Sequence, residues 1–506
     1  MYQGPFAELE EKSISELQAA LAAGELTSRG LVEMYQARIQ ALDRDGPALR
    51  SVLELNPDAL ASADALDEER RIKGPRGLLH GIPLLLKDNI ATADRMQTTA
   101  GSLALLGSRP ARDAFVAQRL REAGAILLGK ANLSEWANFR STTSSSGWSA
   151  RGGQALNPYV LDRSPCGSSS GSATAVAANL VPASLGTETD GSILSPAATN
   201  GVVGIKPTVG LTSRAGVIPI AHSQDSVGPF GRTVADAAVL LGAITGVDPR
   251  DPATAGSAGH FFTDYTQFLD RAGLQGARLG IPRKVYTGYS PKIDAAFHAV
   301  IEQMRGLGAV IIDPADIPHA KEMEESKNEE TVLLFELKAD LNAYLADLES
   351  SPVRTLAEII AFNEAHAEEE LLYFGQEHFL RAQETSSLTD ATYLAALEEN
   401  RHLAGREGID AVMDEYKLDA LVMPTISLPC RIDLVNGDHF AGGCSQPAAL
   451  AGYPGVSVPA GFIFELPFGI TFMGRAYSEP TLIKLAYAFE QGTQVRRPPR
   501  YLPTTP

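Results

Sequence analysis

The chain has 506 residues, enough for a large hydrophobic core, and its 44% hydrophobic and 21% charged residues are typical of a folded globular enzyme. A formal net charge of −18 argues against nucleic acid or an anionic membrane surface as a partner. The three cysteines, Cys166, Cys430 and Cys444, are too few for a disulfide framework and lack the spacing of metal ligands.

The N-terminal stretch MYQGPFAELEEKSIS lacks the basic and apolar regions of a signal peptide, and no run of 18 apolar residues predicts a membrane span. We therefore expect a soluble protein without a membrane partner, and we expect it to be a monomer. The compartment stays open. The chain is either cytoplasmic or exported with its signal peptide absent from this sequence.

The first part of the chain begins with predicted helices. Ser13 and Glu16 make a capping box that opens a helix closed by Gly24, and Thr27 or Ser28 begins a second one. The polar segment ASADALDEERR predicts a further helix on the surface. These elements form a packing layer.

An apolar run at residues 82–86 follows the polar segment and predicts a short buried strand that ends at Lys87. A helix and a strand are predicted within residues 114–128. Strands that alternate with helices predict an α/β core with a parallel or mixed sheet. The loop over residues 132–153 holds both tryptophans, which either shape a cleft or pack in the core.

The stretch from Cys166 to Thr208 is rich in glycine, serine and alanine. A Gly-Ser loop is predicted to enter a helix at residues 172–179, and a turn at residues 186–192 presents several backbone N–H groups in a row. Small residues let the backbone approach a ligand, and such N–H groups attract developing negative charge. We therefore expect the reaction centre here.

This stretch, CGSSSGSATAVAANLVPASLGTETDGSILSPAATNGVVGIKPT, resembles the signature of the amidase signature family of serine hydrolases. That family uses one lysine and two serines. By motif they correspond to Lys87 in GIPLLLKDNI, Ser168 in CGSSSG and Ser192 in ETDGSI. The two serines stand 24 positions apart, as in the family.

The resemblance implies that Ser192 is the nucleophile, Lys87 the base and Ser168 the relay between them, with an acyl-enzyme intermediate. Lysine acts as a base only when neutral, and burial favours that form. No cofactor and no metal is implied, and the sequence has no HExxH motif.

The resemblance also implies a cis peptide bond between Gly167 and Ser168, with Gly167 and Ser169 supporting the loop. The candidate oxyanion donors are four backbone N–H groups, those of Thr189, Asp190, Gly191 and Ser192.

Within the family, similarity along nearly the whole chain is greatest to the peptide amidase branch. Asp190 and Ser170 stand where many members have glycine, which favours that branch over the amidotransferases of the family. The function implied is hydrolysis of the C-terminal carboxamide of a peptide to the acid and ammonia. The alternatives are an amidohydrolase for aryl, fatty or small carboxamides, and a non-catalytic binding module.

Three other residues are weaker candidates for the nucleophile or the base. Ser169 is the centre of a GxSxG pattern, but no apolar strand leads directly into it. Cys166 is interpreted as a small buried residue rather than a nucleophile, because no histidine is near it in sequence. His80 is interpreted as structural.

The second half resumes the α/β order after a region rich in proline, glycine and alanine at residues 248–264. Strands are predicted at residues 279–282, 310–312, 418–423, 456–458 and 469–473. Helices are predicted at residues 293–307, 329–348, 356–362 and 368–380 and near the C-terminus. Some of the helical segments between 329 and 380 are candidates for substrate selection, because the resemblance places variable helices over the cleft.

Together these elements predict an α/β protein with the amidase signature fold, a large mixed central β-sheet covered by helices on both faces. We expect a single amidase domain over residues 1–506. Its signature core covers about residues 70–245, and a second α/β and helical part that covers the cleft spans about residues 265–490.

Overall fold

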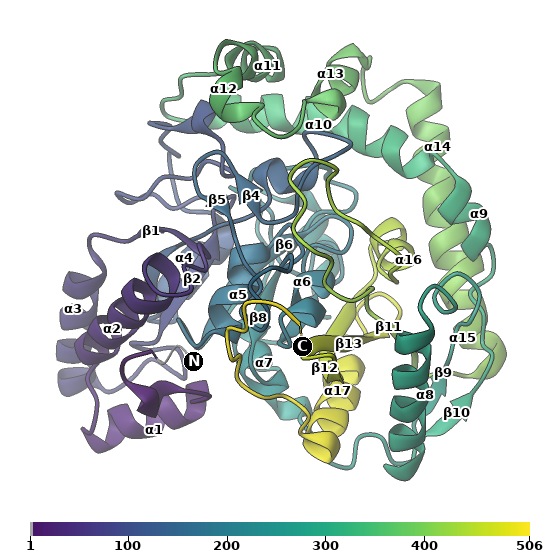
Figure 1. Cartoon of the computed structure of the whole chain (residues 1–506), viewed down its shortest axis with the longest axis horizontal. Helices are drawn as coiled ribbons and strands as arrows, with labels where there is room; N and C mark the ends of the chain where they lie inside the picture. The colour runs from purple at the N-terminus through teal and green to yellow at the C-terminus, as the bar shows by residue number, and fades with distance from the viewer. Residues whose placement is uncertain (1–3, 506) are drawn as a thin grey trace.

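The computed structural model describes residues 4–505 and has a mixed sheet of eleven strands at its centre (Figure 1). The first three residues of the N-terminal stretch and the last residue of the proline-rich tail lie outside this range. The strands of the central sheet are β1 (Val52–Leu55), β2 (Pro83–Lys87), β3 (Ile126–Ala131), β6 (Ala183–Glu188), β7 (Val203–Lys206), β8 (Ser226–Gly231), β9 (Arg278–Gly280), β10 (Val310–Ile312), β11 (Ala420–Pro424), β12 (Gly455–Ile463) and β13 (Leu466–Met473).

The strand order across the sheet is β1-β3-β2-β6-β8-β7-β12-β13-β11-β9-β10. Strand β2 pairs in parallel with both β3 and β6, whereas β8, β7, β12 and β13 run antiparallel to their neighbours. The sheet is therefore mixed, as predicted, and strands from both halves of the chain belong to it. A separate hairpin pairs β4 (Trp148–Ser149) with β5 (Gly153–Gln154).

Helices surround the sheet (Figure 1). In that view α1 to α3 lie at the left, α10 to α13 cross the top, and α8, α9, α14 and α15 lie at the right. The helices are α1 (Ile14–Ala23), α2 (Ser28–Arg38), α3 (Ala59–Lys73), α4 (Phe115–Glu122), α5 (Ser170–Ala177), α6 (Leu194–Thr199), α7 (Val234–Ile244), α8 (Pro291–Gly306), α9 (Ala320–Glu325), α10 (Asn328–Asp347), α11 (Leu356–Ala365), α12 (Ala367–Glu370), α13 (Glu377–Glu384), α14 (Ala391–Arg401), α15 (Asp410–Tyr416), α16 (Gln446–Ala451) and α17 (Glu479–Thr493). Among residues 4–505, no helix has both the length and the apolar character to cross a membrane.

The N-terminal signals are confirmed. Ser13 caps α1 with a full capping box, Gly24 ends this helix in a left-handed conformation, and Thr27 caps α2. In contrast, β1, β6, β7 and β8 were not predicted, and residues 186–188, predicted as part of a turn, belong to β6. The sequences of β7 and β8, VGIK and SVGPFG, contain glycine and proline, which strands disfavour. The glycines serve close packing. A Cβ atom on Gly228 would lie 2.0 Å from the carbonyl oxygen of Ile205.

One predicted helix is wrong. Residues 368–380 form two short helices, α12 and α13, with an irregular segment between them. The segment wraps around the buried guanidinium of Arg140, which donates to the carbonyl oxygens of Phe374 and Gly375. Arg140 also pairs with the buried carboxylates of Glu135 and Glu370. A helical backbone would keep those carbonyl oxygens for its own hydrogen bonds, so the charge cluster outweighs helix propensity here.

The close packing around Gly171 in α5 predicts that one added methyl group there destabilises the protein. A Cβ atom on Gly171 would lie 2.2 Å from the carbonyl oxygen of Ser51 and 2.6 Å from that of Asn132. Backbone atoms cannot move aside cheaply, so Gly171→Ala should lower the free energy of unfolding by about 1–3 kcal/mol. Gly77→Ala is the control, because a Cβ atom there meets nothing within 4 Å. Equal denaturant midpoints for the two variants would contradict this packing.

Candidate active site

Lys87 is the last residue of β2 and is completely buried. Its Nζ donates to Ser168 Oγ at 2.7 Å, to Thr187 Oγ1 at 2.9 Å and to the Thr187 carbonyl oxygen at 3.2 Å. A neutral amine has two hydrogens and one lone pair. Two contacts to Thr187 therefore leave the lone pair of a neutral Lys87 for the hydroxyl hydrogen of Ser168.

The surroundings of Lys87 favour its neutral form. Burial lowers the pKa of Lys87 to about 7, although the carboxylates of Asp225 and Glu188 act in the opposite direction. A group with a pKa near 7 exchanges protons readily at neutral pH. Lys87 can therefore reach the neutral form in which a lysine acts as a base.

The loop before α5 brings Ser168 to Lys87. The peptide bond between Gly167 and Ser168 is cis, as the resemblance implies. Ser169, one position on, turns to Thr187, where its Oγ donates to the carbonyl oxygen at 3.0 Å and accepts from the N–H at 3.2 Å. A larger residue than glycine would clash at position 167, because a Cβ atom there would lie 2.1 Å from Ser134 Oγ. Ser168, and not Ser169, contacts Lys87.

Ser192 lies in the turn between β6 and α6 and is 8% exposed, whereas Ser168 and Lys87 are fully buried. Its carbonyl oxygen accepts a hydrogen bond from the N–H of Ser169 at 3.2 Å, which joins the two serine loops. Of the three, Ser192 is the residue that solvent or a ligand can reach. Its role as nucleophile stays a prediction.

Two features hold this turn. Gly191 has a φ of +75°, and a Cβ atom on it would lie 2.9 Å from Ser445 Oγ. The buried carboxylate of Glu188 accepts from the N–H of Ile193 at 2.6 Å and that of Leu194 at 2.9 Å. Across the part of the chain that the structure describes, the N–H groups at positions 190–192 have no hydrogen-bond acceptor. They remain available to a ligand oxygen.

The loop that holds Gln224 and Asp225 contacts this turn. Asp225 accepts a hydrogen bond of 2.5 Å from Thr189 Oγ1 and others from the N–H groups of Ile220 and Ala221. Burial raises the pKa of the Asp225 carboxyl to about 6. Gln224 Nε2 donates to the Thr189 carbonyl oxygen at 3.4 Å. This loop therefore fixes Thr189, the first residue of the candidate oxyanion turn.

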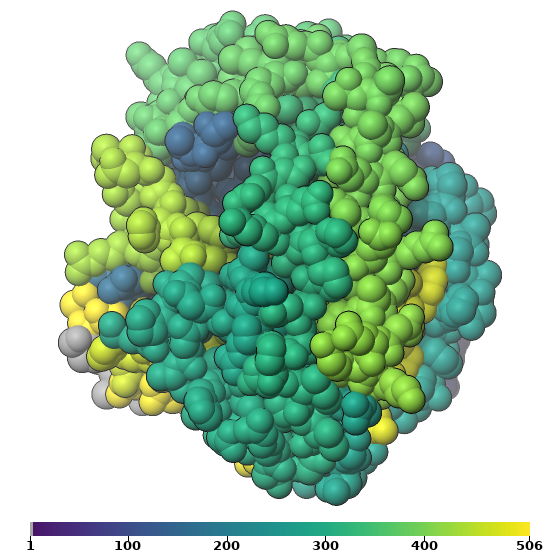
Figure 2. Space-filling view, turned by 90° about the vertical axis from the view of Figure 1, so that its right-hand side faces the viewer, coloured from purple at the N-terminus to yellow at the C-terminus, as the bar shows by residue number. Residues whose placement is uncertain are grey.

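A cleft of about 670 Å³ opens over the turn and reaches Asp190 and Gly191. Its walls include chain segments within residues 138–146 and 426–446. Figure 2 shows a hollow on one face of the molecule, with blue chain at the bottom between green helices and a yellow-green segment, in agreement with those positions. The second half of the chain therefore forms much of the cleft, mainly through loops, and among the described residues His378 is the one lining residue from the helices predicted between residues 329 and 380.

Cys166 differs from expectation, because it is partly exposed and lines the cleft. Desolvation nevertheless raises the pKa of its thiol, so it stays protonated and is a poor nucleophile.

The structural role of His80 is confirmed, since it is buried and its Nε2 lies 2.9 Å from the Leu66 carbonyl oxygen. Trp136 and Trp148 are buried too and pack on aromatic rings of the 373–379 region.

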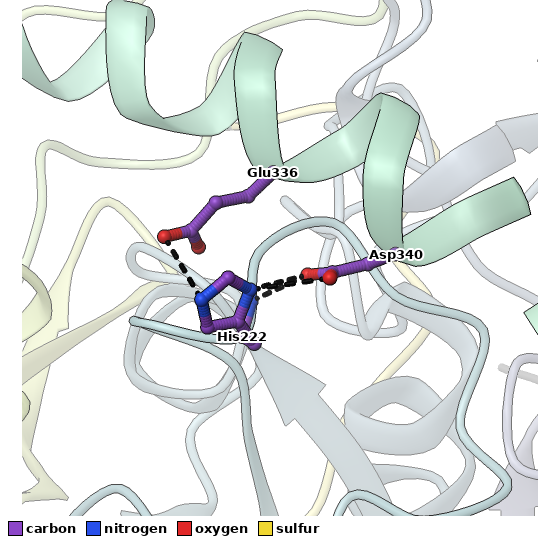
Figure 3. A group of neighbouring side chains, drawn as sticks. All are labelled: His222, Glu336 and Asp340. Atoms are coloured by element: carbon purple, nitrogen blue, oxygen red, sulfur yellow. Dashed lines mark hydrogen bonds and ion pairs between the residues drawn. The ribbon is translucent and has the colours of Figure 1, made fainter. Parts of the chain in front are cut away.

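A second polar cluster joins the loop of Asp225 to α10 (Figure 3). One ring nitrogen of His222 and one carboxylate oxygen each of Glu336 and Asp340 lie within 4.8 Å of one another, close enough to bind one metal ion. However, these side chains already make hydrogen bonds within the protein. Asp340 accepts from the N–H of His222 and lies 2.9 Å from its Nδ1, and Glu336 accepts from the N–H of Ser223 and from Tyr393. We interpret the cluster as a set of structural contacts that attach this loop to α10.

The burial of Lys87 generates a prediction about stability. Its pKa in the folded state is about 7, whereas that of lysine in an unfolded chain is about 10.4, so the unfolded chain binds more protons between these values. The stability of the native protein should therefore rise with pH in this window. Lys87→Met removes that dependence. Its free energy of unfolding relative to the native protein should be highest below pH 7 and fall by up to about 1.4 kcal/mol per pH unit above it.

Denaturant unfolding between pH 6 and pH 10 measures this difference. The exposed Lys73→Met variant corrects for the general effect of removing one positive charge. A stability difference for Lys87→Met that stayed constant over the range would show that Lys87 is charged in the folded protein.

Comparison with known proteins identifies the family. The sequence model of the Amidase family matches residues 30–483. A probable amidase of Arabidopsis thaliana is 49% identical over 502 residues, 98% of this chain and 92% of that protein. One component of the glutamyl-tRNA(Gln) amidotransferase of Chloroflexus aurantiacus is 38% identical over 496 residues, 96% of this chain and 98% of that protein. The X-ray structure of native peptide amidase from Stenotrophomonas maltophilia has a TM-score of 0.93 and 52% identity, covering 98% of this chain and 99% of that one. The chain therefore belongs to the amidase signature family and is a hydrolase that acts on amides.

Proposed function

We propose that the protein hydrolyses the C-terminal carboxamide of peptides to the free acid and ammonia. The observation that carries the proposal is the 2.7 Å contact between Ser168 Oγ and a fully buried lysine whose pKa is about 7. Ser192 accepts a backbone hydrogen bond from Ser169 and lies in the turn whose residues Asp190 and Gly191 line the cleft. The likeness to peptide amidase over 98% of the chain supports the choice of substrate class.

In the proposed reaction, neutral Lys87 takes the hydroxyl proton of Ser168 while Ser168 takes that of Ser192. The Ser192 oxygen then bonds to the carbonyl carbon, and the electron pair of the C=O double bond moves to the oxygen. The free N–H groups at positions 190–192 stabilise that negative charge. A serine hydroxyl is a weak nucleophile without such a base, so the lysine determines the rate of attack.

The same relay completes the cycle. The proton on Lys87 returns through Ser168 to the amide nitrogen, the C=O double bond re-forms as the C–N bond breaks, and ammonia leaves. A water molecule attacks the ester on Ser192, and one of its protons passes through the relay to the Ser192 oxygen as the C=O double bond re-forms, the ester bond breaks and the peptide acid is released. The proton that Ser192 lost to ammonia is thus replaced by one from water.

An ammonia-release assay tests the substrate class. Peptide amides should be hydrolysed with a higher kcat/KM than free glutamine, fatty amides or anilides, and unamidated peptides should not be cleaved internally. Ser192→Ala should abolish turnover and leave folding intact, because the change removes only one hydroxyl. A preference for aryl, fatty or small carboxamides would replace the proposed class by one of those. Activity of Ser192→Ala near that of the native enzyme would place the nucleophile elsewhere.

Two neighbouring serines give a matched pair of variants. Ser168→Ala interrupts the proton path at Lys87 and should lower kcat by about 10²–10⁴-fold, the usual contribution of a proton-transfer group. Ser169→Ala removes hydrogen bonds to the Thr187 backbone, each worth about 1 kcal/mol, and should lower kcat by about tenfold or less. Steady-state kinetics on one peptide amide compares them. Equal losses would mean that the relay does not pass through Ser168.

A further inference from the structure

The cleft has a distinctive charge. Three carboxylates line it, those of Asp190, Glu324 and Asp438, and in residues 4–505 its lining contains no lysine and no arginine. The Asp438 carboxylate accepts a hydrogen bond from the N–H of Ser146 at 3.0 Å. The side chain of Asp190 is exposed to the cleft although its neighbours in the turn are buried, and Glu324 is exposed at the end of α9. Two histidines, His378 and His439, also line the cleft, so the charges that its lining carries at neutral pH are mainly negative.

Two tyrosines stand beside these carboxylates. Tyr286 is 3% exposed and Tyr289 is half-buried, and both line the cleft. Neither hydroxyl has a hydrogen-bond partner among the described residues. Burial raises the pKa of Tyr286, and the carboxylates of Glu324 and Asp190 act in the same direction.

A buried hydroxyl without a partner is costly, by about 1–3 kcal/mol, so native proteins rarely keep one without a ligand or water. We define the acidic recess as Asp190, Tyr286, Tyr289 and Glu324. A neutral ligand could satisfy its hydroxyls but would leave its carboxylates uncompensated. An anion would be repelled. A cation satisfies both, because its N–H groups donate to oxygen atoms and its charge balances the carboxylates.

Glu329, at the start of α10, adds to this charge. Its carboxylate accepts from Gln224 Nε2 and from Gln446 Nε2, each at 3.0 Å. Burial and the charge of Asp190 raise the pKa of Glu329 to about 8. Like charges close together disfavour ionisation, and a cation bound between them would favour it.

We propose that the acidic recess binds an ammonium or guanidinium group on the acyl part of the substrate, so that amides with a basic side chain are preferred. This inference rests on the proposed function. Since the leaving group is ammonia, the acyl part is the place where such a cation can be. Asp190 is two residues before Ser192, so the basic group lies near the carboxamide that reacts.

A pair of amides tests this preference. Nα-acetyl-lysinamide and Nα-acetyl-norleucinamide have side chains of similar length, and only the first carries a charge. In the Ser192→Ala enzyme, calorimetry should show at least tenfold tighter binding of the lysine amide. Its binding at pH 7–8 should also release protons, because a cation in the recess lowers the pKa of Glu329. Equal dissociation constants for the two amides would overturn the inference.

Variants locate the preference. Glu324→Gln and Asp190→Asn, each in the Ser192→Ala background, should reduce the ratio of the two dissociation constants at least threefold. Glu325→Gln is the control, because Glu325 is an exposed neighbour that pairs with Lys321 at 3.4 Å, and it should keep the ratio. An unchanged ratio in both test variants would place the cation elsewhere and overturn the inference.

Kinetics of the native enzyme separates the two proposals. A kcat/KM at least tenfold higher for the lysine amide supports both. If the enzyme hydrolysed neither amide, the proposed function would fail, and the binding ratio would still decide whether the recess holds a cation. Hydrolysis of both amides at equal kcat/KM would support the function and contradict the preference.

Discussion

The structure depends on burying one lysine inside a hydrophobic core. Leu84, Leu85 and Leu86 precede Lys87 on a strand whose five residues are all buried, and water cannot solvate the ammonium there. Ser168 and Thr187 at the end of β6 supply three oxygen contacts to Nζ instead. The loop of Ser168 and the end of β6 must therefore meet at Lys87, and the parallel pairing of β2 with β6 brings β6 there.

Buried charges recur around this point. Lys206 is also fully buried, donates to the Tyr453 carbonyl oxygen at 2.7 Å and interacts with the charge of Glu188, which in turn holds the first turn of α6. The Asp225 loop is tied to α10 through His222. Elements far apart in the sequence are thus joined by polar contacts that keep the floor of the cleft rigid, a condition for precise placement of reacting groups.

Sequence patterns predicted the strand that ends at Lys87, the capped N-terminal helices and the mixed sheet, because each depends on local periodicity or on short motifs. They missed β1, β6, β7 and β8, and in β8 the glycine at position 228 is explained by its close approach to the backbone of Ile205 in β7. The break between α12 and α13 depends on Arg140, more than 200 positions earlier, and no local signal reveals it. For the same reason, Tyr286 and Glu324 could not be assigned to the cleft before the two halves of the chain were placed together.

The position of Asp190 has a consequence for the end of the proposed reaction. Its backbone belongs to the turn that would hold the oxyanion, while its carboxylate faces the cleft in which the acid product forms. Substrate amide is neutral at the reacting group, but the product bears a negative charge at the same place. Like charges at short range repel, so electrostatic expulsion would clear the site after each turnover and oppose the reverse synthesis of the amide.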